Sequence, residues 1–433
     1  MLIEFSVRNF RSFRELGTLS MVAAKLRSRN KELDSNNTFS ADEKLSLLRS
    51  TAIYGPNESG KSNLTAAMGF MKRFVLMSAK DMQAEQPIGV EGFRLSDTSV
   101  DDPSSFEIVF RLEDKVYRYG FAANRERVTE ESLYFVPAGR EVNLFRRKED
   151  IIRVNSSPNR FVEGKGLERR TRPNALFLSV VAQFNGETAR KIIRWFLDFN
   201  VITGLGDDTP LLDYTVNWIK DRERKQGILQ LLHGLDISIL DLRIEETRIT
   251  ADNMPREIPP GLRSMLLNGN RVDVKTQHRR YDKEGHPAGF EEFTLGDQES
   301  QGTQKIVALA GPLLDTLQNG KILVVDEFEA RLHPKITQTI VKLFNSDSTN
   351  PRNAQLVFLT HDTNLLDRHL LRRDQIWFVE KDALEGTSLY SLAEFGVGKV
   401  RNDSSFKEGY IQGRFGALPF IGDLERLVGV SHD

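Results

Sequence analysis

The stretch Gly55-Pro56-Asn57-Glu58-Ser59-Gly60-Lys61-Ser62 decides how this chain folds. It follows the apolar run of residues 50–54 and leads into a helical pattern that begins near Asn63. A glycine-rich loop between a buried strand and a helix lets successive backbone N–H groups converge on phosphate oxygens. The sequence therefore predicts a phosphate-binding loop, and the alternative is a glycine turn that precedes a helix by chance.

Each part of this loop has an expected role. The two glycines lack the Cβ atoms that would prevent a tight turn. Lys61 is expected to reach the terminal phosphates of ATP, and the Ser62 hydroxyl to bind the Mg²⁺ ion that bridges them. The candidate nucleotide-binding residues are Gly55, Pro56, Asn57, Glu58, Ser59, Gly60, Lys61, Ser62 and Asn63.

The sequences on both sides of the phosphate loop predict further secondary structure. Apolar residues at three- and four-residue spacing over residues 64–75 predict a helix with one buried face. Alternating apolar and polar residues predict an N-terminal strand within residues 2–11 and an antiparallel meander within residues 88–154. Residues 25–43 are polar and indicate a surface loop.

The middle of the chain predicts a mixture of helices and strands. Residues 174–183 form a buried apolar run, and no heptad pattern is long enough for an extended coiled-coil arm. We expect helices at residues 188–199 and 211–235, and strands at residues 243–250, 271–281 and 291–295.

A second group of candidate residues lies in the last third of the chain. Ser300-Gln301-Gly302-Thr303 precedes a helical pattern and predicts a second anion-binding helix start, although a simple helix cap is the commoner meaning of such a sequence. The buried strand before Asp326 and Glu327 predicts that Asp326 holds Mg²⁺ and that Glu327 polarises the attacking water. His361 ends another buried strand and is expected to sense the terminal phosphate or to hold that water.

Composition limits the classes of function. Lys and Arg total 60 against 61 Asp and Glu, which argues against a strongly basic nucleic-acid surface, although residues 160–172 are locally basic. The absence of cysteine excludes disulfides and cysteine metal sites. No apolar run approaches the roughly 20 residues that cross a bilayer, so we expect a cytoplasmic protein with no membrane partner.

Together these motifs resemble the ABC-type ATPases of the SMC and RecF kind, over residues 1–80 and 290–380. The resemblance implies an α/β P-loop NTPase fold: an ABC-type head with a mixed sheet, an antiparallel β lobe and a short inserted helical arm. It also implies that two heads sandwich ATP, with Ser300, Gln301, Gly302 and Thr303 acting as the signature on the nucleotide of the opposite subunit. The usual signature has adjacent glycines, whereas Gly302 is followed by Thr303 here.

The resemblance suggests further assignments. Gln183 is the candidate switch glutamine and metal ligand, although Gln83 and Gln86 lie nearer the phosphate loop in the sequence. The expected division is an N-terminal ATPase lobe over residues 1–185, an inserted helical and β arm over 186–290, and a C-terminal ATPase lobe over 291–433.

The C-terminal residues 375–419 narrow the resemblance to the AAA-family ATPases of bacterial abortive-infection and restriction-linked defence systems. This implies an ATP-hydrolysing sensor or scaffold of antiviral defence that controls a separate nuclease or toxin, triggered by a nucleic acid or a phage protein. It also implies a homodimer or higher homo-oligomer that uses ATP and Mg²⁺. The alternatives are a RecF-type DNA-repair ATPase, a scaffold that ATP locks without hydrolysis, and, more weakly, a transporter ATPase.

Overall fold

The computed structural model describes most of the chain, in two compact units. The first unit comprises Met1–Gly204, Thr316–Glu329 and Ile340–Asp433, and the second comprises Leu205–Asp315 and Ala330–Thr339. The described residues are 1–26, 30–97, 99, 102–137, 140–158, 160–203, 208–250, 270–395 and 405–419. Parts of the expected C-terminal lobe, at residues 396–404 and 420–433, lie outside them, and the three-part division of the chain stays a prediction.

A six-stranded sheet forms the centre of the first unit, in the order β11-β15-β16-β5-β17-β18. Neighbouring strands are parallel from β11 to β17, and β18 is antiparallel to β17. The three central strands β5, β15 and β16 are completely buried, as expected of parallel strands that are covered on both faces. Their bounds are β5 Ser50–Tyr54, β11 Phe199–Ile202, β15 Ile322–Val325, β16 Gln355–Leu359, β17 Ile376–Lys381 and β18 Thr387–Ser391.

An antiparallel seven-stranded sheet, in the order β10-β9-β8-β7-β6-β1-β2, forms the lobe predicted from the alternating sequence. Buried and partly exposed residues alternate along β1 and β6, so one face of the sheet lies in the core. The bounds are β1 Leu2–Arg8, β2 Gly17–Ser20, β6 Ser104–Leu112, β7 Lys115–Ala123, β8 Val128–Val136, β9 Val142–Lys148 and β10 Ile151–Val154.

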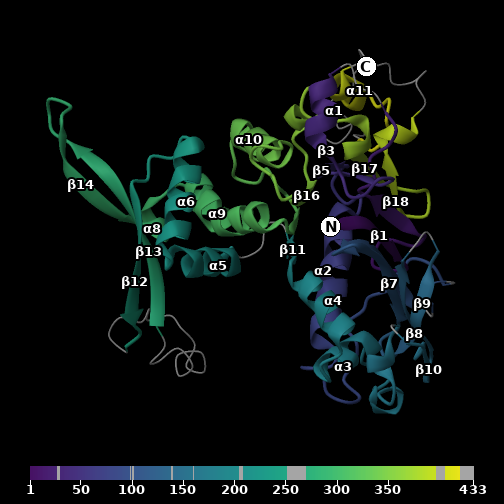
Figure 1. Ribbon diagram of the computed structural model, residues 1–433. Helices are drawn as coiled ribbons and strands as arrows, with labels where there is room; N and C mark the ends of the chain where they lie inside the picture. The colour runs from purple at the N-terminus through teal and green to yellow at the C-terminus, as the bar shows by residue number, and fades with distance from the viewer. Residues whose placement is uncertain are drawn as a thin grey trace, which may run out of the picture. The chain divides into compact units, whose positions relative to one another are not determined.

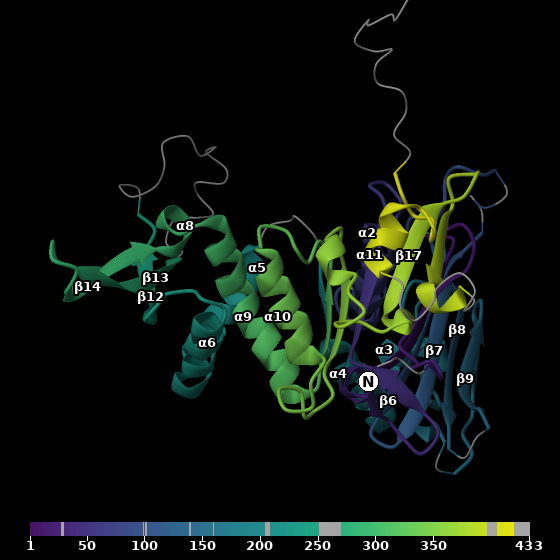
Figure 2. The ribbon, with the colours of Figure 1, turned by 90° about the horizontal axis from the view of Figure 1, so that it is seen from above.

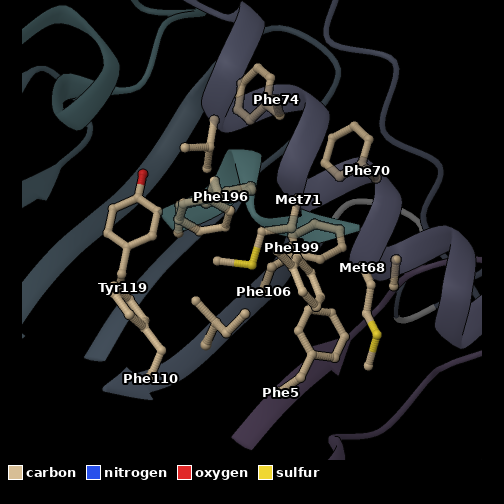
Figure 3. Packing of buried hydrophobic residues seen from close by; sticks show 14 of the residues in the cluster. Phe5, Met68, Phe70, Met71, Phe74, Phe106, Phe110, Tyr119, Phe196 and Phe199 are labelled. Atoms are coloured by element: carbon tan, nitrogen blue, oxygen red, sulfur yellow. The ribbon is translucent and has the colours of Figure 1, made fainter. Parts of the chain in front are cut away.

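Helix α2 (Lys61–Met77) begins at the phosphate loop and is buried in the core of the first unit. Figure 3 shows its residues Met68, Phe70, Met71 and Phe74 among aromatic side chains from β1, β6 and β7, from α4 (Glu187–Leu197) and from β11. The buried face predicted for residues 64–75 is confirmed. Because both sheets contribute to this core, α2 holds the loop in a fixed position relative to the strand ends.

Two local predictions for the first unit were incomplete. The polar segment 25–43 contains a helix, α1 (Lys31–Asn37), whose start is capped by the side chain of Asn30. The buried apolar run at residues 174–183, for which the sequence predicted no type of element, contains a helix, α3 (Phe177–Gln183). The other elements of this unit are β3 Thr38–Ser40, β4 Ser46–Leu48, η1 Val162–Gly164, η2 Glu168–Arg170, η3 Thr363–Leu365, η4 Arg373–Gln375, η5 Leu392–Glu394 and α11 Phe406–Ile411.

The second unit combines helices with a three-stranded antiparallel sheet, β12-β13-β14. The single helix expected at 211–235 is two helices, because Asp221 caps a new helix by accepting the N–H of Arg224 at 3.0 Å. Figures 1 and 2 show the far ends of β13 and β14 extending away from these helices. The bounds are α5 Thr209–Ile219, α6 Arg222–Gly234, β12 Asp241–Arg248, β13 Asn270–Tyr281, β14 Pro287–Thr294 and α8 Leu295–Gln298.

Two further helices, α9 (Gln301–Asn319) and α10 (Pro334–Phe344), contribute residues to both units. α9 directly follows the predicted signature residues, and α10 follows the acidic segment that begins at Asp326. Within the described residues, no helix combines the length and the apolar character that spanning a membrane requires.

Candidate nucleotide site

The candidate residues of the first unit meet where neighbouring parallel strands end. The N–H of Asp326 donates to Ile202 O, and the N–H of Thr360 donates to Ile53 O, each at 3.0 Å. The carboxyl ends of β11, β15, β16 and β5 are thus joined at one edge of the sheet, where open α/β folds bind ligands. A pocket of about 250 Å³ lies there, lined by residues 56–63, Asp326, Glu327, Leu359, Thr360 and His361.

The two loop glycines are required by close packing. A Cβ atom on Gly55 would lie 2.3 Å from the backbone oxygen of Val379, and one on Gly60 would lie 2.1 Å from Thr387 Oγ1. Gly60 also has a φ of 99°, in the left-handed region that other L-residues rarely adopt. No side chain caps the start of α2 at Gly60, so its first N–H groups can point toward an anion.

Lys61 is buried at the base of this loop, with 7% of its surface exposed. Its Nζ donates to the backbone oxygens of Gly55 at 2.7 Å and Pro56 at 2.9 Å. Burial lowers the pKa of Lys61 to about 8, and the carboxylates of Asp326, Glu329 and Glu327 act in the opposite direction. The ammonium group is therefore largely charged at neutral pH and lies within the phosphate loop.

Asp326 lies next to the start of α2. Burial raises its pKa, and hydrogen bonds from the Ser62 hydroxyl and the Glu327 N–H oppose that shift. Oxygen atoms of Ser62 and Asp326 are therefore within hydrogen-bonding reach of each other, and oxygen is the ligand that Mg²⁺ prefers. Among the described residues, no group of three or more His, Cys, Asp or Glu side chains is arranged so that it could hold a metal ion.

Glu327 and His361 line the same pocket from adjacent loops. Glu327 has a φ of 50°, a conformation that costs a non-glycine residue about 1 kcal/mol or more and recurs at functional sites. Burial lowers the pKa of His361, and the charge of Lys61 lowers it further. A neutral imidazole and a carboxylate therefore both lie at the pocket that contains Lys61.

Sequence reasoning missed two hydroxyl groups that support the phosphate loop. Thr387 Oγ1 donates to Ser12 Oγ at 2.7 Å and is also 3.0 Å from the backbone oxygen of Ser59. Ser12 Oγ also accepts a bond from Asn63 Nδ2 at 2.7 Å. Ser12 follows β1 closely and could have been suspected, but nothing near Thr387 in the sequence indicates that it packs against Gly60.

Gln183 is the exposed last residue of α3 and is not among the residues that line the pocket in the described part of the chain. The backbone oxygens of Gln83 and Gln86 accept hydrogen bonds from Asn174 Nδ2 at 2.8 and 2.9 Å. Neither alternative lines the pocket. The choice of a switch glutamine thus gains no support from the geometry.

The predicted signature residues belong to the second unit, where they form the start of α9. Ser300 Oγ accepts the N–H of Thr303 at 3.1 Å and lies 2.9 Å from Thr303 Oγ1. A Cβ atom on Gly302 would lie 2.8 Å from the backbone oxygen of Arg331, so the glycine permits close packing. These contacts make Ser300 a helix cap, and its in-trans contact with a nucleotide stays a prediction.

Comparison with known proteins places the phosphate loop and the acidic strand within one family. Residues 50–367 match the family described as "AAA domain, putative AbiEii toxin, Type IV TA system". No curated protein matches the chain. The family match begins at β5 and includes β15 and β16, so it covers every element that lines the pocket.

Several solved structures are similar to the chain at low identity. A structure described as an SMC head bound to the C-terminal winged-helix domain of ScpA is 13% identical, with 90% of this chain and 97% of that chain covered at a TM-score of 0.44. The SMC head domain from Thermotoga maritima is also 13% identical, with coverages of 90% and 98% and a TM-score of 0.39. RecF with ATP is 15% identical, with coverages of 83% and 93% and a TM-score of 0.32.

Proposed function

Because the chain belongs to the AAA-domain family described as a putative AbiEii toxin of a Type IV toxin–antitoxin system, we propose that it binds ATP with Mg²⁺ and hydrolyses it. The observation that carries this proposal is the single pocket shared by Lys61, Asp326, Glu327 and His361. Such a pocket combines a phosphate-binding loop with acidic groups at the place where the γ-phosphate would react.

Each residue has a role in this proposal. The N–H groups at the start of α2 and the ammonium group of Lys61 bind the phosphates and balance their charge. Ser62 and Asp326 hold Mg²⁺, which stabilises the negative charge that develops during phosphoryl transfer. Glu327 polarises the attacking water, and His361 orients that water or contacts the γ-phosphate.

Two lysines on α2 give a matched test of ATP binding. Burial lowers the pKa of both Lys61 and Lys72 to about 8, but Lys72 does not line the pocket. We expect Lys61→Ala to lower ATP turnover by about 100-fold or more and Lys72→Ala to leave turnover within about twofold. Equal turnover in the wild type and Lys61→Ala, measured by phosphate release, would contradict the assignment.

We also propose that two or more copies of the chain sandwich ATP, with Ser300, Gln301, Gly302 and Thr303 contacting the nucleotide of a second copy. The order of the motifs along the chain supports this proposal, as does the position of these four residues at the start of α9. A Glu327→Gln variant is expected to bind ATP but to turn it over slowly, so light scattering should show a mass that increases with ATP. A mass that does not depend on ATP would count against the sandwich, unless the protein is already an oligomer.

The proposed biological role is that of an ATP-dependent sensor or scaffold in antiviral defence that controls a separate effector, a nuclease or toxin. The toxin–antitoxin wording of the family description supports this role. The same wording favours a second candidate, in which this chain is itself the toxin. Expression of the chain alone decides between them: growth arrest that requires Lys61 identifies the toxin, and normal growth supports a separate effector encoded nearby.

A further inference from the structure

A third carboxylate, Glu329, lies beside the proposed site and has no role in the reaction as described. Its Oε1 accepts the backbone N–H of His361 at 2.6 Å. Its Oε2 is buried and makes no hydrogen bond among the described residues. One carboxylate oxygen of Glu329 therefore binds the backbone of His361, whose imidazole has a proposed role in ATP hydrolysis.

The contact belongs to a short connection between two loops. Phe328, the residue before Glu329, also contacts the end of β16. Its N–H donates to Leu359 O at 3.0 Å, and its ring lies 5.1 Å from the ring of Phe358. These contacts fix the spacing of the two backbones. Glu329 then adds a charge-assisted hydrogen bond, the stronger kind, at the residue where the chain leaves β16.

The surrounding charges fit a role that acts through His361. Lys61 and burial favour a neutral imidazole, and the negative charges of Glu329 and Asp326 oppose them. Glu329 does not line the pocket, so within the described residues its route to the reaction is the backbone of His361.

We propose that Glu329 is a positioning residue that holds the backbone of His361 so that the imidazole faces the pocket lined by Lys61 and Glu327. This inference rests on the proposed ATP hydrolysis, because the orientation of His361 affects turnover only if the γ-phosphate reacts in this pocket. Glu329 itself contacts neither the nucleotide nor the attacking water.

Two substitutions separate the hydrogen bond from the charge. Glu329→Gln keeps a carbonyl oxygen that can accept the His361 N–H, whereas Glu329→Ala removes the acceptor. We expect Glu329→Ala to lower kcat about tenfold with KM for ATP within about twofold, and Glu329→Gln to keep kcat within about threefold. Equal losses in the two variants would overturn the role of the hydrogen bond.

The His361→Ala background tests whether the effect passes through the imidazole. His361→Ala keeps the backbone N–H but removes the ring, so Glu329→Ala should cause no further loss of kcat in that background. An unchanged tenfold loss there would show that Glu329 acts by another route and would overturn the proposal. Thermal unfolding of each variant identifies any loss that comes from misfolding.

The contact can also be measured without turnover. The chain has seven histidines, so selective ¹⁵N-histidine labelling gives few amide signals, and the one lost in His361→Ala belongs to His361. That signal should shift strongly in Glu329→Ala and only slightly in Glu329→Gln, and an unmoved signal in Glu329→Ala would overturn the inference. A wild type without ATP turnover but with this shift would instead refute the proposed hydrolysis and, with it, any effect of the contact on kcat.

Asp367 provides a matched control. Its Oδ1 accepts the N–H of another histidine, His369, at 2.8 Å, and neither residue lines the pocket. Asp367→Ala should therefore move the His369 signal and leave kcat within about twofold. A similar loss of kcat in Asp367→Ala and Glu329→Ala would mean that such contacts act only on general stability, which would contradict a positioning role for Glu329.

Discussion

Two helices of this chain begin near a glycine and hydroxyl residues, but their N-terminal N–H groups have different partners. α2 starts at Gly60, which has a φ of 99° and no side-chain cap. α9 starts after Ser300, whose Oγ accepts the N–H of Thr303 at 3.1 Å. Uncapped N–H groups can bind an external anion, whereas a capped helix start already has part of its donors satisfied.

This difference separates two signals that look alike in the sequence. The hydroxyl groups of Ser12 and Thr387 pack against Gly60 from outside the helix and are hydrogen-bonded to each other. Gly302 instead allows α9 to approach the backbone of Arg331. A glycine at a helix start therefore leaves the first N–H groups without a side-chain cap in one case and permits close packing in the other.

The largest expected effect tests the uncapped start. Gly60→Ala and Gly166→Ala each place an alanine at a positive φ, 99° and 86°, but only the Cβ at Gly60 would collide with a neighbouring atom. We expect Gly60→Ala to weaken ATP binding about 100-fold, equivalent to about 3 kcal/mol. Titration with a fluorescent ATP analogue measures this, and Gly166→Ala should bind normally. Similar affinities for both variants would show that ATP binding does not depend on the close packing at Gly60.

The next effect tests whether the capped start also acts as a signature. Ser300→Ala and Asp221→Ala each remove a helix cap in the second unit, from α9 and α6, and each should cost about 1 kcal/mol of stability. Only Ser300→Ala should also lower ATP turnover, by about tenfold. If turnover in Ser300→Ala matches that in Asp221→Ala, then Ser300 is a cap and nothing more.

A smaller effect concerns the hydroxyl groups that support Gly60. Thr387→Val removes the bonds to Ser12 and Ser59 while keeping a similar shape, which should cost about 1 kcal/mol and weaken ATP binding about fivefold. Thr38→Val removes a hydroxyl bond of 2.8 Å away from the pocket and serves as the control. Calorimetric titration with ATP measures both affinities. Equal binding by the two variants would show that the Thr387 hydroxyl group does not support the phosphate loop.

The smallest effect concerns packing at α9. Gly302→Ala gains about 1 kcal/mol of helix propensity but places a Cβ 2.8 Å from Arg331 O, so a net loss of about 1 kcal/mol is expected. Gly296→Ala, in α8, has no atom within 4 Å of its Cβ and should be slightly stabilising. Chemical denaturation measures both, and a stabilising Gly302→Ala would show that close packing does not require the glycine.

Local patterns predicted much of the fold. The phosphate loop, the strand before Asp326 and the meander of the antiparallel lobe were predictable because their hydrophobic periodicity and turn residues lie within short segments. The helices near residues 31–37 and 177–183 were not, since short helices with a polar or uniformly apolar sequence lack periodicity. β11 was missed because its four residues directly follow the helical pattern of α4.

The candidate site was predictable only in part, for a related reason. The predicted site residues each follow a strand or loop that the sequence pattern indicates; they are Lys61, Ser62, Asp326, Glu327 and His361. The contact between Ser12 and Thr387 joins residues separated by 375 positions, and that between Glu329 and His361 joins residues separated by 32. Such long-range pairs leave no periodic pattern, so a single sequence does not reveal them.

Phosphate release by the wild type and by Glu327→Gln, in the presence of Mg²⁺, is the most direct test of whether this chain hydrolyses ATP. Both proteins should bind ATP with similar affinity, because the proposed role of Glu327 is to polarise the attacking water and not to bind the phosphates. We expect multiple turnovers in the wild type and a rate lower by about 100-fold or more in Glu327→Gln. Equal rates in the two proteins, or no turnover in a wild type that binds ATP, would contradict this expectation.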